Sequence, residues 1–204
     1  MKIYLERKGN TLSNLTVHKY MNIELRLYSI VRRKRPDCRK GTARQVFDNL
    51  VNQKFSADSI NEKWCTDFTY LFLTDGSKHY NCFILDLHDR SVVASITDKN
   101  ITADLAMRTL KKALESQKNV SPNLVLHSDQ GSQYTSKDFI EFCTNAGVTQ
   151  SMSNAGYPYD NAPMERYYNT LKNELIYLHY YHNDQELNAS IEEFAYVTYN
   201  HIIT

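Results

Sequence analysis

The sequence predicts a mixed α/β domain preceded by a short basic helical segment. Three β-rich runs follow one another between Trp64 and Thr97, and helix-like and strand-like segments alternate from Thr102 onward. Lys and Arg outnumber Asp and Glu by 13 to 4 in residues 1–54, whereas the remaining residues carry 11 Lys or Arg and 19 Asp or Glu. We therefore divide the chain into a basic segment, 1–54, and a larger α/β domain, 55–204.

The basic segment is expected to form short helices. One helix is predicted within residues 11–30, starting after a Ser13 or Asn14 cap. Its buried side is expected to carry Leu15, Tyr20 and Leu25. This fragment is too small to fold alone, and its pattern is typical of the end of a helix-turn-helix module. A second short helix is expected around residues 43–52.

The larger domain is expected to contain five strands and three helices. The predicted strands are 64–73, 79–87, 91–97, 123–127 and 148–152. The predicted helices are 102–118, 136–145 and a last one that starts near Asn161, with Pro163 in its first turn. The apolar stripe of that last helix is Met164, Tyr168, Leu171, Leu175 and Leu178. Three adjacent strands followed by alternating helices and strands predict a mixed sheet flanked by helices.

Composition excludes several classes of protein. No run approaches the roughly 18 to 20 apolar residues that a membrane span needs, and the first residues lack the apolar stretch of a signal peptide. We expect a cytoplasmic protein. The four cysteines form no Cys-x-x-Cys pair and match no histidine spacing, which argues against zinc and disulfides and favours reduced core thiols.

Three carboxylates are candidates for chemistry. Asp67 interrupts an apolar strand, where it needs a cation, hydrogen bonds or an open sheet edge. Asp129 follows an apolar strand directly, at the kind of strand end where ligands bind in α/β sheets. Glu165 lies one turn into the last helix, beside its apolar stripe. Taken singly, these residues also fit an edge aspartate, an Asx-turn and a helix-dipole glutamate.

Taken together, the three carboxylates favour a metal site. Two strands of one sheet and a helix packed across it bring such residues to one point. Hard oxygen ligands suit Mg²⁺ or Mn²⁺, and two such ions would support in-line displacement at phosphorus. The sequence therefore predicts Asp67, Asp129 and Glu165 as catalytic residues and metal ligands.

The motifs around these residues resemble the Asp-Asp-Glu integrase core. They are Trp64-x-x-Asp67-x-Thr69-Tyr70, His127-Ser128-Asp129-x-Gly131-x-Gln133-Tyr134-x-Ser136 and Asp160-Asn161-Ala162-x-x-Glu165-x-x-x-x-x-Leu171-Lys172-x-Glu174, with 35 residues between Asp129 and Glu165. The chain is most similar to the second-frame product of bacterial insertion-sequence transposases encoded by two overlapping reading frames. Retroviral integrases are more distant relatives. The resemblance covers residues 60–200.

The resemblance implies a ribonuclease H-like fold, divalent metal at the three carboxylates, and DNA cleavage followed by strand transfer. It also implies that the segment before the core helps to recognise DNA ends, that the protein acts as a homo-oligomer on DNA near the bacterial nucleoid, and that a first-frame protein is a possible partner. Family members extend beyond both ends of this sequence. A truncated, inactive remnant that binds DNA or the full-length transposase is therefore the alternative, whereas an RNA-cleaving nuclease is disfavoured.

Several other residues are candidate DNA contacts. The basic run consists of Arg32, Arg33, Lys34 and Arg35, which would release counterions on binding a polyanion but also fits a solvated linker. Near the carboxylates, the candidates are Gln133, Tyr134, Arg166 and Lys172. Loop packing for the first two and ordinary surface charge for the last two are equally open. We interpret His127 as a core residue or one that supports the loop, with a place at the edge of the metal site as its alternative. We interpret Asp75 and Asp86 as turn residues, with the metal pocket as the alternative for Asp86.

Overall fold

The computed structural model describes residues 2–27 and 45–203 of the 204-residue chain. Contacts divide the chain into two compact units, residues 1–39 and 40–204. The boundary predicted from charge, between residues 54 and 55, therefore differs from the contact boundary. Residues 45–54 belong by contact to the second unit, and the division at 54/55 stays a proposal about charge.

The first unit contains short helices. Helix α1 spans Lys2–Arg7, helix α2 spans Asn14–Lys19, and a π-helical turn, η1, follows at Tyr20–Glu24. Ser13 caps α2 as expected, because its side chain accepts a hydrogen bond from Thr16 N at 3.1 Å. The predicted buried side is wrong, since Leu15, Tyr20 and Leu25 are all exposed. Among the described residues of this unit only Val17 is buried, so there is no core for those side chains to enter.

The second unit is built on one five-stranded sheet in the order β3-β2-β1-β4-β5. The strands are β1 (Lys63–Phe72), β2 (Lys78–Asp86), β3 (Val92–Asp98), β4 (Val125–Ser128) and β5 (Thr149–Met152). The pairs β1–β2 and β2–β3 are antiparallel, whereas β1–β4 and β4–β5 are parallel. The predicted mixed sheet is confirmed, and all five strands fall where the sequence predicted them.

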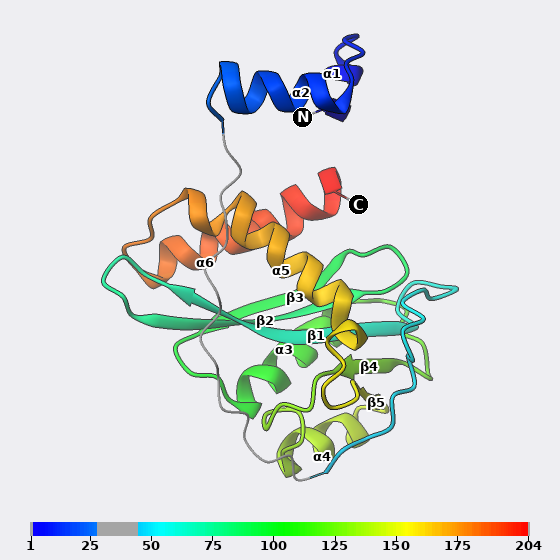
Figure 1. Cartoon of the computed structure of the whole chain (residues 1–204). Helices are drawn as coiled ribbons and strands as arrows, with labels where there is room; N and C mark the ends of the chain where they lie inside the picture. The colour runs from blue at the N-terminus through cyan, green and yellow to red at the C-terminus, as the bar shows by residue number, and fades with distance from the viewer. Residues whose placement is uncertain (1, 28–44, 204) are drawn as a thin grey trace. The chain divides into compact units, whose positions relative to one another are not determined.

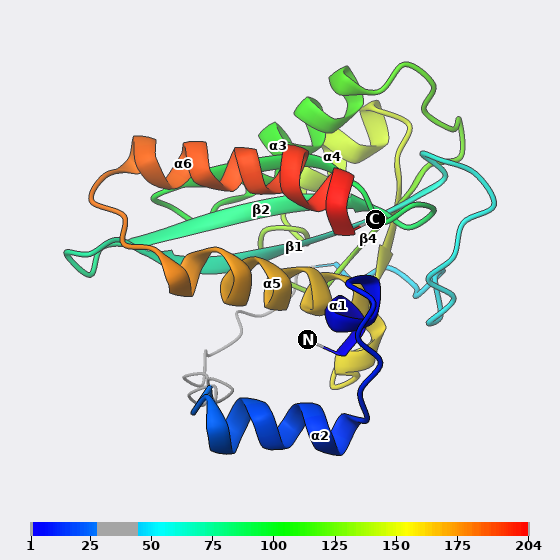
Figure 2. The same ribbon diagram turned by 90° about the horizontal axis from the view of Figure 1, so that it is seen from above.

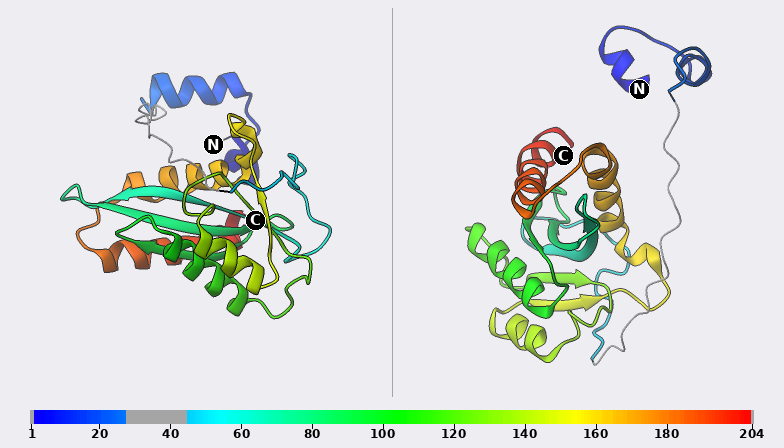
Figure 3. Two further views of the ribbon diagram at one scale, coloured as in Figure 1. Left: turned by 90° about the horizontal axis from the view of Figure 1, so that it is seen from below. Right: turned by 90° about the vertical axis from the view of Figure 1, so that its left-hand side faces the viewer.

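Helices cover both faces of the sheet. Helices α3 (Ala103–Ser116) and α4 (Lys137–Asn145) lie on one face, and α5 (Ala162–Glu174) and α6 (Asp184–Glu193) lie side by side on the other (Figures 1 and 2). The right-hand view of Figure 3 shows α5 and α6 above the sheet and α3 and α4 on its other side. Thr102 and Ser136 cap α3 and α4 through bonds to the amides of Leu105 and Phe139. The arrangement is a ribonuclease H-like fold.

Each face of the sheet has its own hydrophobic core, because side chains alternate along a strand. On β1, Trp64 packs in the core beneath α3 and α4, whereas Cys65 packs in the core beneath α5 and α6. By the same alternation, Thr66 and Phe68 face α3 and α4, and Asp67 faces α5.

Helix α5 is anchored by a row of buried residues, namely Met164, Tyr167, Tyr168 and Leu171. The ring of Tyr167 meets Phe83 edge-on at 4.6 Å between centroids, and Phe83 is the β2 partner of Asp67. The Tyr168 hydroxyl donates a hydrogen bond to the backbone carbonyl of Asp67. These contacts hold α5 directly over the middle of β1.

Two helix predictions need correction. The helix expected around 43–52 is wrong over its described part, 45–52. There, Leu50 N donates to Ser151 Oγ at 2.9 Å and Met152 N donates to Asp48 O at 3.3 Å, so the segment bonds to β5 and forms no helix. Asn52 and Gln53 also have left-handed φ values of 46° and 61°, which an α-helix does not allow.

The C-terminal end of the chain also differs from prediction. Helix α5 ends at Glu174, and a 3-10 turn at Ile176–Leu178 leaves Leu178 exposed. Helix α6 and the π-helical segment η4 (Phe194–Ile203), which continues from it, were not predicted. The signal was the Asn183-x-x-Glu186 pattern: Asn183 caps α6 at Glu186 N, and the Glu186 carboxylate accepts from His182 N.

Within the described part of the chain, no helix is both long and apolar enough to cross a membrane. Cys65, Cys82 and Cys143 are free and buried, as expected for core thiols, and burial raises the pKa of Cys82 to about 11. The fourth cysteine, Cys38, lies outside the described residues.

The two neighbouring tyrosines of α5 provide a test of this packing. Replacing Tyr168 by Phe removes the bond to the Asp67 carbonyl, and we expect a loss of about 1 kcal/mol in the free energy of unfolding. Tyr167→Phe is the matched control, because the buried Tyr167 hydroxyl has no hydrogen-bond partner among the described residues. In urea unfolding, the free energy of unfolding of Tyr167→Phe should equal or exceed that of the parent. Equal losses in both variants would contradict the assigned bond.

Candidate active site

Asp67 lies in the middle of β1, half-buried beneath α5. Its Oδ1 accepts a hydrogen bond from Phe68 N at 2.7 Å, and its Oδ2 accepts one from Asn161 Nδ2 at 3.0 Å. Asn161 immediately precedes α5. The carboxylate therefore bonds both to its own strand and to the start of the helix that covers it.

Asp129 is brought beside Asp67 by the parallel pairing of β4 with β1. The register pairs Cys65 with His127. Asp67 lies two residues after Cys65, and Asp129 lies two residues after His127. Because side chains alternate, both aspartates face the α5 side of the sheet. Asp129 therefore follows the carboxyl end of β4, the kind of place where α/β proteins bind ligands, and lies beside Asp67 in the middle of β1.

Glu165 belongs to the first turns of α5 and is exposed. It lies four residues after Asn161 and three before Tyr168, and both of those residues bond to Asp67. Residues three and four apart lie on one face of a helix. Glu165 is therefore on the face of α5 that borders Asp67, toward the solvent side.

Carboxylate oxygens are the ligands that Mg²⁺ and Mn²⁺ prefer, so the chemistry of the three side chains fits such an ion. The described ranges, 2–27 and 45–203, contain no group of three or more His, Cys, Asp or Glu side chains gathered closely enough to hold a metal. One buried polar atom at the site, Asn161 Oδ1, has no hydrogen-bond partner among the same residues. Donor chemistry and placement thus fit a divalent cation, although the carboxylates are not gathered into a finished ligand set.

Gly131 holds the loop after β4 close to Asp129. Asp129 Oδ1 accepts a hydrogen bond from Gly131 N at 2.8 Å, and a Cβ at this glycine would lie 2.8 Å from the same Oδ1. No side chain fits in that space while the carboxylate keeps its position. The glycine therefore permits the present orientation of Asp129.

His127 supports the segments around the site, in agreement with the interpretation from the sequence. It is fully buried, and burial lowers its pKa, so the imidazole is neutral at pH 7. Its Nε2 lies 2.9 Å from the backbone carbonyl of Asp160, which can only accept, so Nε2 carries the proton. Nδ1 then accepts from Ser151 Oγ at 2.8 Å. The histidine thus ties β4 and β5 to the turn that precedes α5.

Asp160 is the hub of that turn and is only 2% exposed. Gln53 Nε2 donates to its Oδ1 at 2.8 Å, while Asn49 Nδ2 at 2.9 Å and the backbone and side-chain amides of Asn154 donate to its Oδ2. These hydrogen bonds hold the pKa of Asp160 below its usual 3.8, and the bond from Gln53 has the largest effect. Asp160 thereby joins the segment before β1 to the start of α5.

Asp86 lies away from this site. It ends β2 opposite Trp64, and its buried carboxylate accepts bonds from Asn61 N, Trp64 Nε1 and His88 N. Burial raises its pKa. The interpretation of Asp86 as a turn residue is confirmed.

Comparison with known proteins agrees with this geometry. Residues 57–158, half of the chain, match the integrase core domain family. The putative transposase InsK for insertion sequence element IS150 of Escherichia coli (strain K12) is 32% identical over 190 residues, which cover 93% of this chain and 66% of that protein. The insertion element IS600 uncharacterized 31 kDa protein of Shigella sonnei is 36% identical over 155 residues, 76% of this chain and 56% of that protein.

The chain belongs to the family of insertion-sequence transposases with an integrase core domain. A third member, the transposase for insertion sequence element IS904 of Lactococcus lactis, is 34% identical over 152 residues. The chain spans less than two thirds of the length of these three relatives, between 56 and 66%.

Solved structures confirm the integrase-like fold. A chain of the simian T-cell lymphotropic virus intasome matches with a TM-score of 0.59 at 19% identity, covering 96% of this chain and 68% of that one. The catalytic domain of Mos1 mariner transposase matches with a TM-score of 0.54 at 11% identity, covering 66% of this chain and 70% of that one. At such low identities the likeness concerns the fold alone.

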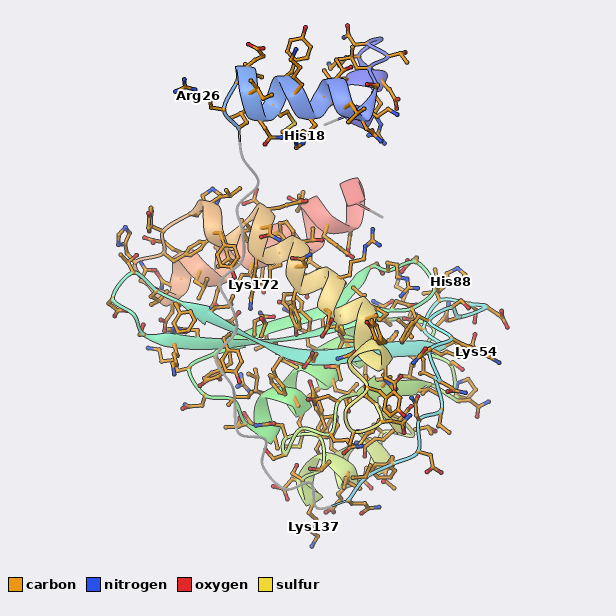
Figure 4. All side chains as sticks on the ribbon, in the orientation of Figure 1. His18, Arg26, Lys54, His88, Lys137 and Lys172 are labelled. Carbon is orange, nitrogen blue, oxygen red and sulfur yellow. The ribbon has the colours of Figure 1, made fainter. Side chains whose placement is uncertain are left out.

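The predicted DNA contacts have varied placements. Arg32, Arg33, Lys34 and Arg35 lie outside the described residues. Arg166 is exposed on α5. Lys172, which is labelled in Figure 4, lies on the same helix and is half-buried. Gln133 is half-buried, and its Nε2 lies 3.5 Å from Ile101 O.

Tyr134 is only 1% exposed and points into the core. Its hydroxyl lies 3.1 Å from Thr66 Oγ1, and its ring packs on Phe68. This placement corresponds to the loop-packing interpretation, because a buried ring cannot reach a base or sugar. We therefore no longer propose Tyr134 as a DNA contact.

Sequence reasoning missed the structural roles of Asp160 and Asn161, although both belong to the quoted motifs. Their partners are distant in the chain: Asn161 is 94 residues from Asp67, and Asp160 is 111 residues from Asn49. The available signal was the pair of polar residues, Asp160 and Asn161, just before an amphipathic helix. Taken alone, such a pair predicts only a helix cap.

The Gly131→Ala variant tests the crowding at Asp129. The new Cβ would push away the end of a flexible side chain, so we expect a folded protein with a displaced carboxylate. Metal-dependent activity should fall about 10–100-fold, the usual cost of disturbing a ligand's support. Ser132→Ala, at an exposed neighbouring position, is the control. Unchanged activity in Gly131→Ala would contradict the role of this glycine.

The Asp160→Asn variant tests the hub. At pH 7 an amide nitrogen would face the existing donors, and we expect a loss of about 1–3 kcal/mol in unfolding free energy. Because the folded pKa of Asp160 is lowered, its contribution is present above pH 3.8 and is lost as the pH falls through the folded pKa. The difference from the parent, measured by urea unfolding, should therefore shrink below pH 3.8. Glu141→Gln, exposed on α4, is the control at pH 7 and should be as stable as the parent.

Proposed function

We propose that this chain is the catalytic part of a transposase that cleaves DNA phosphodiester bonds and transfers strands, with Asp67, Asp129 and Glu165 as its catalytic residues. The observation that carries the proposal is the parallel pairing of β1 with β4 beneath α5. Asp67 and Asp129 each lie two residues after the paired Cys65 and His127, and Glu165 lies between Asn161, the N-cap of α5, and Tyr168, which both bond to Asp67.

The residues that would hold divalent metal are Asp67, Asp129 and Glu165. The Mos1 transposase catalytic domain, which shares the fold, has been solved with Mg. A pair of Mg²⁺ or Mn²⁺ ions at these carboxylates would supply a Lewis acid for displacement at phosphorus. The protein's own contribution is to orient the carboxylates, through Asn161 at Asp67 and Gly131 at Asp129.

DNA is the proposed partner, both as element ends and as target. The residues proposed to contact phosphates near the carboxylates are Arg166, exposed on α5, Lys172, further along the same helix, and Gln133, in the loop after Asp129. The basic run Arg32–Arg35 would add affinity through counterion release. We further propose that the protein acts as a homo-oligomer on DNA at the bacterial nucleoid, with a first-frame protein as an additional partner.

The decisive experiment is Mn²⁺-dependent nicking of supercoiled plasmid. Parent protein and Asp129→Asn are prepared identically, with Mn²⁺ binding measured by calorimetry and the fold by circular dichroism. We expect the parent to nick, and Asp129→Asn to keep its fold but to lose both nicking and tight Mn²⁺ binding. Asp86→Asn is the contrasting variant, because Asp86 is a buried carboxylate away from the site, and it should still bind Mn²⁺ if it remains folded.

Two results would count against the proposal. Equal nicking by parent and Asp129→Asn would indicate that the activity does not come from these carboxylates. Mn²⁺ binding by the parent without any nicking would instead favour the inactive-remnant hypothesis.

A further inference from the structure

We infer that Asn161 is a positioning residue that presets the carboxylate of Asp67 for cation binding. The inference rests on the proposed function. Asn161 Nδ2 donates to Asp67 Oδ2 at 3.0 Å, and the asparagine is only 8% exposed. The reverse amide orientation would set two acceptor oxygens against each other, so the chemistry of the pair fixes which atom faces Asp67.

The position of Asn161 in its helix supports this role. It occupies the N-cap of α5, where asparagine ordinarily accepts bonds from first-turn amides. Its side chain makes no such cap bond. The side chain is directed to Asp67 on β1 instead, so a local helix-stabilising contact is replaced by a contact between the helix and the strand.

The backbone beneath Asn161 is held from several directions. The preceding residue, Asp160, receives side-chain bonds from Asn49, Gln53 and Asn154, and its carbonyl accepts from His127. The side-chain amide of Asn161 therefore extends from a turn that is hydrogen-bonded to β4 and to the segment before β1. A hydrogen-bond donor on so constrained a backbone limits the orientations that its carboxylate partner can adopt.

The chemistry of an amide suits a ligand-positioning role. Lys or Arg at this place would neutralise Asp67 and compete with a cation, whereas an amide orients the carboxylate and leaves its full charge. The buried Oδ1 of Asn161, which has no partner in the described part of the chain, adds an acceptor beside Asp67. Buried acceptors of this kind are normally satisfied, and the water shell of a bound cation would satisfy this one.

The test is an Asn161→Ser variant. Serine is as good an N-cap as asparagine, so the start of α5 should be retained, but its side chain is too short to reach Asp67. We expect an unchanged or higher Tm, with Mn²⁺ affinity by calorimetry weakened about 10–100-fold. Nicking should fall at limiting Mn²⁺ and recover in part at saturating Mn²⁺. Asn173→Ala, exposed on the same helix and bonded to Asn169, is the matched control and should behave as the parent.

Asp67→Asn separates this inference from the proposed function. If Asp67→Asn loses Mn²⁺ binding while Asn161→Ser binds within about threefold of the parent, the positioning role is overturned and the metal site stands. If Asp67→Asn also binds Mn²⁺ normally, the proposed metal site itself fails. A purely structural role for Asn161 would lower the Tm without changing the Mn²⁺ affinity of the folded protein, which would equally overturn the inference.

Discussion

The parallel pairing of β1 with β4 is the constraint on which the candidate site depends. Its register pairs Cys65 with His127, so Asp67 and Asp129, each two residues further along, lie on the same face of the sheet. An antiparallel pairing would direct the two strands oppositely and put the residue that follows β4 at the other end of β1. Helix α5 completes the arrangement, because Tyr168 and Asn161 bond to the backbone and side chain of the same aspartate.

The polar residues around the site show how the chain offsets the cost of burying them. Asp160 and Asp86 are both buried carboxylates, yet their pKa values shift in opposite directions. At Asp160 the amide donors of Gln53, Asn154 and Asn49 outweigh burial and favour the ionised form. At Asp86 desolvation outweighs the bonds from His88 and Asn61. The ionised hub thus lies where segments distant in the chain must be joined, next to the start of α5.

Much of the fold was predictable because its signals are local. β-rich runs separated by turn signals located the strands, and Thr102 and Ser136 marked the starts of α3 and α4. Local signals failed where distant partners decide the conformation. Residues 45–52 bond to β5 instead of forming a helix, and Tyr134, next to a catalytic candidate in sequence, turns into the core to meet Thr66. The N-terminal helix has a correct Ser13 cap but exposed apolar residues, since capping is local and burial requires a partner surface.

The sequence by itself determined the fold class, the family and the identity of the three candidate carboxylates, because strand periodicity, capping residues and motif spacing are all properties of the linear chain. Only the tertiary structure decided which groups support those carboxylates. The contacts of Asp67 with Asn161, of Asp160 with Asn49 and Gln53, and of His127 with Asp160 each join residues more than 30 positions apart. No local pattern encodes such pairs, because they form only when the register of β1 on β4 and the packing of α5 bring their elements together.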